Sequence, residues 1–324
     1  MRVLLHPFLS LCLLASAALA PLAHADSYPN KPVRVVVHNT PGSALDIVAR
    51  RVGARLADQW GQPVVVDNRA GAGSVIAADA VAKAAPDGYT LLAGADGPIT
   101  ILPTLAASLP YDPRRDLVPV VSLGETDFLL VAHPKTGFKT VADFVRAAKT
   151  RPGQYNYASA GNGSPQHFAA ELLKQQAGIY VTHIPYRGGP VGLADVVAGQ
   201  VDVMFIAVGP ALAHVQAGRL VALASGGEAR HPLLPNVPTL SETYPGLRAG
   251  TWFGLFAPAA TPPAVLEALG AEVAKVLADP RVRSDLAAQG IRATGYPQGR
   301  FTAFVSQESG KYATLVKSTG IRAE

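Results

Sequence analysis

Cysteine is almost absent from this chain, because Cys12 is the single one among 324 residues. It lies in an apolar N-terminal stretch that we expect to be removed from the mature protein. Leu11 precedes it where a lipid-attachment signal requires a small residue, so we predict no lipid anchor. The mature chain therefore cannot form a disulfide, a thiolate metal site or a cysteine nucleophile.

The N-terminal stretch has the three parts of a secretory signal peptide. Arg2 is followed by an apolar run, and an Ala-x-Ala cleavage site ends at Ala25. We predict that residues 1–25 are cleaved after Ala25 and that the mature protein is periplasmic. Neither this run nor any later one is long and apolar enough to predict a membrane span.

Charged and aromatic residues are also sparse, at 16% and 7% of the chain, whereas 49% is hydrophobic. The signal peptide holds one of the 28 basic residues and none of the 23 acidic ones, which leaves a mature net charge of +4 (27 − 23). Because the bases are scattered, we predict no nucleic-acid binding. The 299 mature residues (324 − 25) suffice for two lobes, and we expect a monomer.

Runs of β-branched and apolar residues alternate with helical patterns in the first part of the mature chain. We predict buried parallel strands at 33–37, 64–66 and 89–93, with helices between them. This βαβαβ order is typical of a doubly wound α/β sheet. A second set of strands and helices follows, and three amphipathic helices end the chain. The further predicted strands are 118–121, 128–132, 155–159, 181–185, 202–206, 220–224 and 251–257.

Two loops lead directly from a strand into the N-terminus of a helix. One contains Gly161 and Gly163, and it is followed by Ser164 as the N-cap and Pro165 as the first helical residue. The other loop is 38–43. Free backbone N–H groups and the positive end of a helix dipole suit an anion. The alternative is a pair of well-capped turns that bind nothing.

Ser164 and His167 are three residues apart, so they can share a helix face, and an exported serine hydrolase is an alternative function. The Gly-x-Ser-x-Gly elbow is absent, which favours a capping role for the serine. The histidines are isolated along the chain and predict no metal site. Gly71 and Gly73 resemble part of a dinucleotide fingerprint, but a charged tract precedes them, so we predict a tight turn and no cofactor. Arg187 either meets a ligand carboxylate or lies on the surface.

Ten short motifs follow one another in order over the whole mature chain. They include Pro-Gly-x-x-x-Asp-x-x-Ala-Arg at 41–50 and Tyr-Ala-Ser-Ala-Gly-Asn-Gly-Ser-x-x-His at 157–167. Together they resemble the Bug family, the extracytoplasmic solute-binding receptors of tripartite tricarboxylate transporters. The motif segments are 28–34, 41–50, 61–73, 84–92, 109–113, 157–167, 185–188, 199–205, 234–239 and 252–255.

The resemblance implies a type II periplasmic binding protein, in which two doubly wound α/β lobes are joined by two crossing strands and hold the ligand between them. We expect 26–122 and 224–324 to form one lobe and 123–223 the other. The resemblance also implies a non-enzymatic receptor that captures a small organic carboxylate and delivers it to integral-membrane transporter subunits. Presentation of the ligand to a sensor kinase stays an alternative.

The resemblance further implies that backbone amides and small polar side chains of the second-lobe loop bind the carboxylate, and that waters bridge it to the first-lobe loop. The expected ligand-binding residues are Asn39, Pro41, Gly42, Ser43, Ala95, Asp96, Gly97, Ser159, Gly161, Gly163, Ser164, His167, Tyr186, Ile206 and Ala207.

The chain departs from the family pattern at several of these positions. Ser43 replaces a usual glycine, and Asn39 replaces a common aromatic residue. Asp96 lies in a loop that usually carries small residues, threonine or serine, and Ile206 and Ala207 follow where an aspartate is frequent. We therefore expect a carboxylate whose far end is apolar near Ile206 or carries a donor for Asp96, rather than an amino acid.

Overall fold

A computed structural model describes residues 28–71 and 74–319. The predicted signal peptide, 1–25, and two residues of the predicted tight turn, 72–73, lie outside the described residues. The strands are β1 Val33–Val37, β2 Val64–Asn68, β3 Thr90–Ala95, β4 Leu117–Ala132, β5 Asn156–Ser159, β6 Thr182–Pro185, β7 Val203–Ala207, β8 Val221–Ser225, β9 Gly250–Pro258 and β10 Arg292–Ala293.

The helices lie between these strands and after them. They are α1 Ala44–Trp60, α2 Val75–Ala82, α3 Leu102–Leu105, α4 Pro113–Asp116, α5 Val141–Thr150, α6 Pro165–Ala177, α7 Gly189–Val197, α8 Val208–Gln216, α9 Pro263–Ala278, α10 Pro280–Ala287 and α11 Gln298–Thr319. A π-helical turn, η2 Gly97–Ile101, precedes α3, and short 3₁₀ turns are η3 Pro134–Thr136 and η4 Leu240–Glu242. Within the described ranges no helix is both long and apolar enough to cross a membrane.

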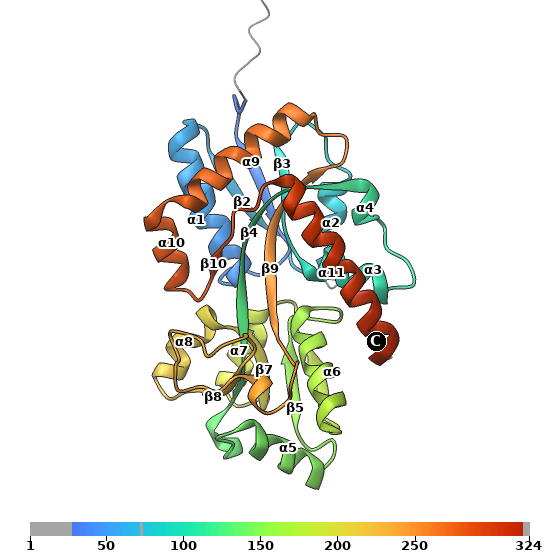
Figure 1. Cartoon of the computed structure of the whole chain (residues 1–324), viewed down its shortest axis with the longest axis vertical. Coiled ribbons are helices and arrows are strands. Elements are labelled where there is room, and N and C mark those ends of the chain that lie inside the picture. The colour runs from blue at the N-terminus through green and yellow to red at the C-terminus, as the bar shows by residue number, and fades with distance from the viewer. Residues whose placement is uncertain (1–27, 72–73, 320–324) are drawn as a thin grey trace, which may run out of the picture.

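The chain forms two α/β lobes joined by the long strand β4, which runs from one lobe into the other (Figure 1). The strand order is β2-β1-β3-β9-β4-β7-β5-β6, with β8 and β10 also paired to β4. The first part of β4 pairs antiparallel with β9, from Leu117 opposite Pro258 to Asp127 opposite Gly250. Its last five residues pair antiparallel with β7. The predicted α/β class with two lobes is therefore confirmed.

The prediction of two separate strands at 118–121 and 128–132 is wrong, because β4 is continuous through both. The intervening Ser-Leu-Gly-Glu-Thr-Asp carries too many polar residues to read as a buried strand. In the structure these residues still pair with β9, with register shifts at Pro119/Val121 and Ser122/Gly124. Tertiary pairing thus overrides the weak local preference.

The limits of the lobes stay a prediction, and the hydrogen bonds around Phe128 suggest where the chain returns. The Phe128 amide donates to Ala249 O (2.9 Å), and the Gly226 amide donates to Phe128 O (2.7 Å). Residues 226 and 249, in the segment between β8 and β9, therefore both hydrogen-bond to β4, although they come after residue 223, where we predicted the second lobe to end. We propose that the chain re-enters the first lobe along β9, at Gly250.

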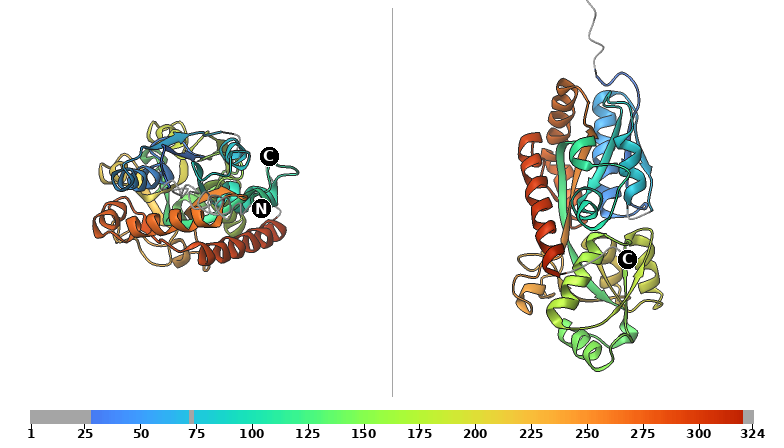
Figure 2. Two further views of the ribbon diagram at one scale, coloured as in Figure 1. Left: turned by 90° about the horizontal axis from the view of Figure 1, so that it is seen from above. Right: turned by 90° about the vertical axis from the view of Figure 1, so that its right-hand side faces the viewer.

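Alternating side chains of the central strands pack two helical layers onto the first-lobe sheet. Val33, Val35 and Val37 of β1 share a buried cluster with α1 and α9, while Val36 packs with α2 and with Phe301 of α11. Figure 2 shows the two layers on opposite faces of the sheet. This two-sided burial explains why β1 is a continuous run of valines after Arg34.

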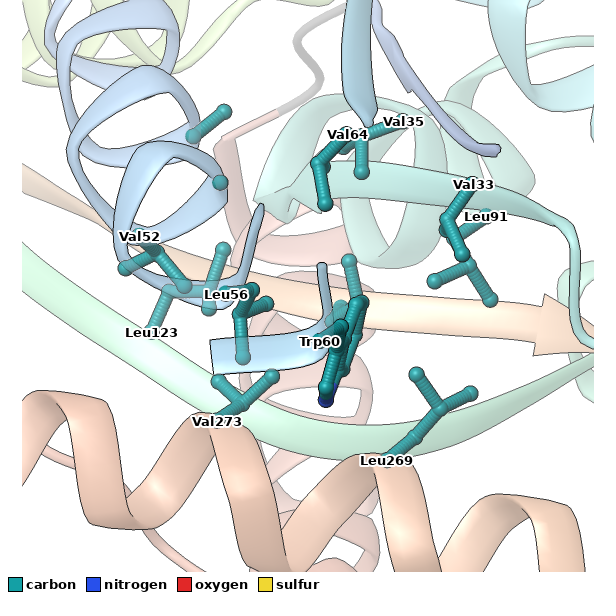
Figure 3. A pocket seen from close by; sticks show the side chains of 13 residues that line it. Val33, Val35, Val52, Leu56, Trp60, Val64, Leu91, Leu123, Leu269 and Val273 are labelled. Carbon is teal, nitrogen blue, oxygen red and sulfur yellow. The ribbon is translucent and has the colours of Figure 1, made fainter. Parts of the chain in front are cut away.

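A small cavity in the first lobe is a gap in this packing. It lies between α1, α9 and the sheet, with Leu56, Trp60 and Leu269 in its wall (Figure 3). Its volume is about 20 Å³, and apolar side chains line it. A polar ligand or an ordered water requires polar partners, so we do not assign a binding role to this cavity.

A buried acid, Asp96, connects three elements near the boundary of the lobes. It follows β3 and is 1% exposed, and it accepts hydrogen bonds from Thr251 Oγ1 of β9 (2.7 Å) and the Tyr312 hydroxyl of α11 (3.1 Å). Tyr312 also packs edge-on against Phe168 of α6 at 5.2 Å. The C-terminal helix therefore contacts both lobes.

The aromatic cluster under α11 predicts a large stability loss on truncation. Phe301 is fully buried and lies 5.4 Å from Phe256 and 5.8 Å from Trp252 between ring centroids. We expect Phe301→Ala to lower the free energy of unfolding by about 3–5 kcal/mol in urea denaturation, because it leaves a cavity. The matched control Phe304→Ala truncates a partly buried ring of the same helix and should cost less. An equal cost for both would contradict this packing.

Asp96 predicts a pH dependence of stability. Burial raises its pKa to about 7, although the hydrogen bonds from Thr251 and Tyr312 act in the opposite direction. An unfolded aspartate ionises near pH 4, so between about pH 4 and pH 7 the folded protein holds a proton that the unfolded chain releases. Stability from this group is thus full below about pH 4 and is lost as the pH rises through about 7.

The variant Asp96→Asn removes this titration. We expect the difference in free energy of unfolding, variant minus native, to be larger at pH 8 than at pH 4.5. Both proteins are measured by urea denaturation at each pH. A difference that does not change with pH would show that Asp96 is ionised throughout.

Candidate functional site

The two lobes meet at two neighbouring chambers, which lie where strands of both lobes end. The small chamber has a volume of about 40 Å³ and the large chamber about 350 Å³. His38 and Asn39, directly after β1, line both. The carboxyl ends of strands are where open α/β sheets bind ligands.

The small chamber draws its wall from β-strand ends and helix starts of both lobes. It is lined by His38, Asn39, Ser43, Ala44, Leu45, Ala95, Phe128, Pro165, Gln166, Gly189, Pro190, Ile206, Ala207, Pro210, Thr251 and Phe253. Residues at the N-termini of α1, α6, α7 and α8 are all in this set. Of these described residues, none is an aspartate, glutamate, lysine or arginine, so the helix dipoles give the chamber a positive potential.

The four helices differ in how their first amides are satisfied. In α1, the Ser43 hydroxyl accepts from the Asp46 amide (3.2 Å), and the Asp46 carboxylate accepts from the Gly42 amide (3.0 Å). In α6, Ser164 caps the helix in the same way. Over their described residues α7 and α8 lack a side-chain cap, because Gly188 and Ala207 precede them. Their first-turn amides are therefore the ones most available to a ligand.

The charge of Asp46 is fixed by its own partners. Burial acts to raise the pKa of this carboxyl, but hydrogen bonds from Arg50, the Gly42 amide and Asn68 outweigh it and hold the pKa below its usual value. Asp46 therefore stays ionised and partly neutralises the N-terminus of α1. The uncompensated dipoles in the small chamber belong to the second lobe.

The large chamber has a different composition. It is lined by His38, Asn39, Gly71, Ser74, Ala160, Gly161, Asn162, Pro185, Tyr186 and Arg187. Arg187 supplies a formal positive charge at this chamber. The Tyr186 hydroxyl donates to Asp195 of α7 (2.6 Å), and this hydrogen bond holds the ring in its orientation.

The residues around Ser164 act as loop supports. The Ser164 hydroxyl accepts from the His167 amide (3.3 Å), and the His167 Nδ1 accepts from the Gly163 amide (3.3 Å). Ser159 Oγ bonds His183 Nε2 (2.6 Å) and accepts from the Gly161 amide (3.0 Å). These contacts hold the loop 160–163 in place and give Ser164 the geometry of a helix cap.

A stack of three rings lies behind this loop. His183 is 4.2 Å from His167 and 4.8 Å from Tyr157 between ring centroids, and both pairs are nearly parallel. Burial, and then the nearby His167, lower the pKa of His183 to about 4, so it is neutral at pH 7. The stack joins β5, α6 and β6 into a rigid support for the loop.

The structure brings together only part of the predicted site. Asn39, Ser43, Ala95, Ile206 and Ala207 line the small chamber, and Asn39, Gly161 and Tyr186 line the large one. The remaining predicted residues are not part of the chamber walls. They are Pro41, Gly42, Asp96, Gly97, Ser159, Gly163, Ser164 and His167.

Asp96 is the clearest departure from the expected placement. Its carboxylate bonds Thr251 and Tyr312 and lines a groove beside α11, which shares Pro165 and Thr251 with the small chamber, although Asp96 is not part of the chamber wall. The predicted contact between Asp96 and a donor on the ligand stays a prediction. Within the chain, α11, more than two hundred residues later, already supplies a hydrogen-bond partner for this acid.

Sequence reasoning missed His38 and Gln166, both of which are buried and in the wall of the small chamber. His38 could have been found, because it directly follows a buried strand, where ligand-binding residues of α/β sheets gather. Gln166 lies in the first turn of α6, and no sequence pattern marks it as a ligand-binding residue.

The lobes touch on both sides of the chambers. A Cβ added to Gly188 would come within 2.8 Å of Asn39 Oδ1, and one added to Gly163 would overlap the Leu102 side chain. Leu102 belongs to α3 of the first lobe, whereas Gly163 belongs to the second. Backbone of the second lobe therefore approaches the first closely, and the chambers are in a closed arrangement.

Comparison with known proteins points to one family. A family model described as tripartite tricarboxylate transporter family receptor matches residues 48–321. Protein BugT of Bordetella pertussis (strain Tohama I) is 35% identical over 311 residues, which is 95% of this chain and 95% of BugT.

Solved structures agree over nearly the whole chain. MatC from Rhodopseudomonas palustris, with bound malate, has 33% identity and a TM-score of 0.85, covering 89% of this chain and 100% of MatC. A protein of R. palustris solved with adipate has 31% identity and a TM-score of 0.88, covering 91% of this chain and 99% of that one. These similarities confirm the predicted type II, two-lobed fold and the predicted resemblance to the Bug proteins. This chain belongs to the family of tripartite tricarboxylate transporter receptors.

Proposed function

We propose that this protein is a periplasmic solute-binding receptor that captures a small organic carboxylate between its lobes and performs no catalysis. The observation that carries the proposal is the convergence of four helix N-termini on a chamber whose described wall has no charged side chain. A carboxylate near one such terminus gains about 0.3–1 kcal/mol, and up to about 2 kcal/mol when partly buried. Several termini acting together hold an anion without a cationic side chain.

The similar structures support the ligand class. MatC was solved with malate and the R. palustris protein with adipate, and both are organic acids. Phe128, Ile206 and Phe253 give the small chamber an apolar side, which suits the carbon chain of such an acid. An amino acid fits less well, because its ammonium group would find no carboxylate in the described wall of that chamber.

The predicted partners and location belong to this proposal. Membership of the receptor family supports delivery of the ligand to integral-membrane transporter subunits in the periplasm. The predicted signal peptide, cleaved after Ala25, agrees with export. Presentation of the ligand to a sensor kinase remains the alternative use of the same binding event. The serine hydrolase alternative has little support, because the Ser164 hydroxyl serves as a helix cap.

We further propose that the site residues divide into two groups. Asn39, Ser43, Gly161, Tyr186 and the Ile206–Ala207 pair contact the ligand, because they line the chambers. The other residues of the predicted set position the loops that carry these contacts. Opening and closing would then occur where β4 and β9 cross between the lobes.

Ligand binding should be visible as stabilisation of the native protein. We expect protein purified from the periplasm without refolding to carry one small carboxylic acid per chain in native mass spectrometry. In a thermal-shift screen of mono-, di- and tricarboxylates, a ligand at 100 times its Kd should add about 2.7 kcal/mol of stability. If amines or sugars raise the Tm while every carboxylate leaves it unchanged, the proposal is wrong.

Gly163 offers a test of lobe closure with a closely matched control. Gly163 and Gly137 have almost the same backbone, with φ of +72° and +73°. A Cβ at Gly163 would overlap Leu102, whereas among the described atoms a Cβ at Gly137 meets nothing within 4 Å. Alanine therefore causes similar backbone strain at both positions, but only Gly163→Ala opposes closure.

We expect Gly163→Ala to weaken binding of the identified carboxylate by about tenfold or more, equivalent to about 1.4 kcal/mol, as measured by calorimetry. Gly137→Ala should leave the affinity unchanged, and the double variant Gly163→Ala/Leu102→Ala should regain part of it. Equal affinities for the two single variants would show that this contact does not belong to the bound state.

A further inference from the structure

His38 is a buried histidine whose ring makes no hydrogen bond to the rest of the described chain. Both ring nitrogens, Nδ1 and Nε2, are inaccessible to solvent and unpartnered among the described atoms, and the residue is 5% exposed. Most buried polar groups in proteins have a partner, and an orphan costs about 1–3 kcal/mol. Such a group at a binding cleft points to a partner that arrives from outside the chain.

The position of the ring identifies that partner as the ligand. His38 lies directly after β1 and lines both the small and the large chamber. Thr40 Oγ1, two residues later, is likewise buried and unpartnered in the part of the chain that the structure describes. Three of the eight unpartnered buried side-chain atoms of the described residues therefore lie in this one first-lobe loop, which faces the second lobe.

The protonation state decides what the ring can bind. Burial lowers the pKa of His38 to about 4, although a contact of the ring with its own backbone acts in the opposite direction, so the imidazole is neutral at pH 7. A neutral imidazole has one N–H donor and one nitrogen acceptor. An ionised carboxylate accepts hydrogen bonds only, so by itself it satisfies the donor and leaves the acceptor unpaired.

A hydroxyl group complements the remaining capacity of the ring. A hydroxyl can donate as well as accept, and in a hydroxy acid it lies within a few bonds of the carboxylate. The helix N-termini would receive the carboxylate while the ring meets the hydroxyl at the boundary of the chambers. A site built around such a contact rejects an analogue that lacks the hydroxyl, because polar groups of the protein are then left unpaired.

We propose that His38 is a specificity-determining residue of the cleft and that it selects hydroxycarboxylates by hydrogen bonding to their hydroxyl group. This inference rests on the proposed function, since it assumes that a carboxylate occupies the chambers. It assigns His38 a role that the family resemblance does not supply.

The first test compares acids that differ by a single hydroxyl. The matched probes are malate and succinate, citrate and tricarballylate, lactate and propionate, and 3-hydroxybutyrate and butyrate. We expect the native protein to bind at least one hydroxy acid tenfold or more tightly than its partner in calorimetry. In His38→Phe, which keeps a ring but removes both nitrogens, this preference should fall below about threefold. His214→Phe, at a site outside the two chambers, is the control and should preserve it.

The second test needs no variant and protects the inference if His38→Phe fails to fold. The ¹⁵N resonances of the histidine rings are followed by NMR while the best-binding acid of the panel is added. We expect the His38 ring signals to shift on saturation, while those of His133 and His214 stay in place.

The outcomes separate this inference from the function on which it rests. If carboxylates bind but no hydroxy acid is preferred, or the His38 signals do not move, the role of His38 is refuted and the receptor function survives. The same result is expected if a buried water, and not the ligand, makes the hydrogen bond to the His38 ring. If no carboxylate binds at all, both the receptor proposal and the proposed role of His38 are refuted.

Discussion

The antiparallel pair of β4 and β9 is the element on which the rest of this structure depends. Because β4 spans both lobes, its first part belongs to the sheet of one lobe and its last residues to the sheet of the other. The two sheets therefore meet at a fixed place, with their strand ends facing each other. A single hydrogen-bonded ribbon sets the relation of the lobes and leaves a narrow region in which they can bend.

This arrangement explains why the chambers suit an anion without an anionic or cationic cluster. Strands β1 and β7 end at the boundary of the lobes, and α1 and α8 begin there, as α6 and α7 do. The positive ends of these helices are thus directed to one place by topology alone. Where the first lobe adds a charge, at Asp46, it is held by Arg50 and Asn68 and serves its own helix.

Two buried titratable side chains near this boundary, Asp96 and His38, differ in their hydrogen bonding. Asp96 is satisfied from within the chain by Thr251 and Tyr312, and it thereby ties the C-terminal helix to the centre of the molecule. His38 finds no such partner among the described residues. The first is a structural group, and the second is open to a ligand, although both follow a strand of the same sheet.

The sequence by itself determined the alternation of strands and helices, the capping of α6 at Ser164 and, through its motifs, the two-lobed fold. These features depend on residues close together in the chain. The continuity of β4 and the placement of Asp96 could not be predicted, because they depend on β9 and α11, more than a hundred residues away. Only the tertiary structure decided which of the polar residues after each strand line the chambers, since hydrogen-bond partners from distant segments satisfy some of them and leave others, such as His38, without a partner among the described residues.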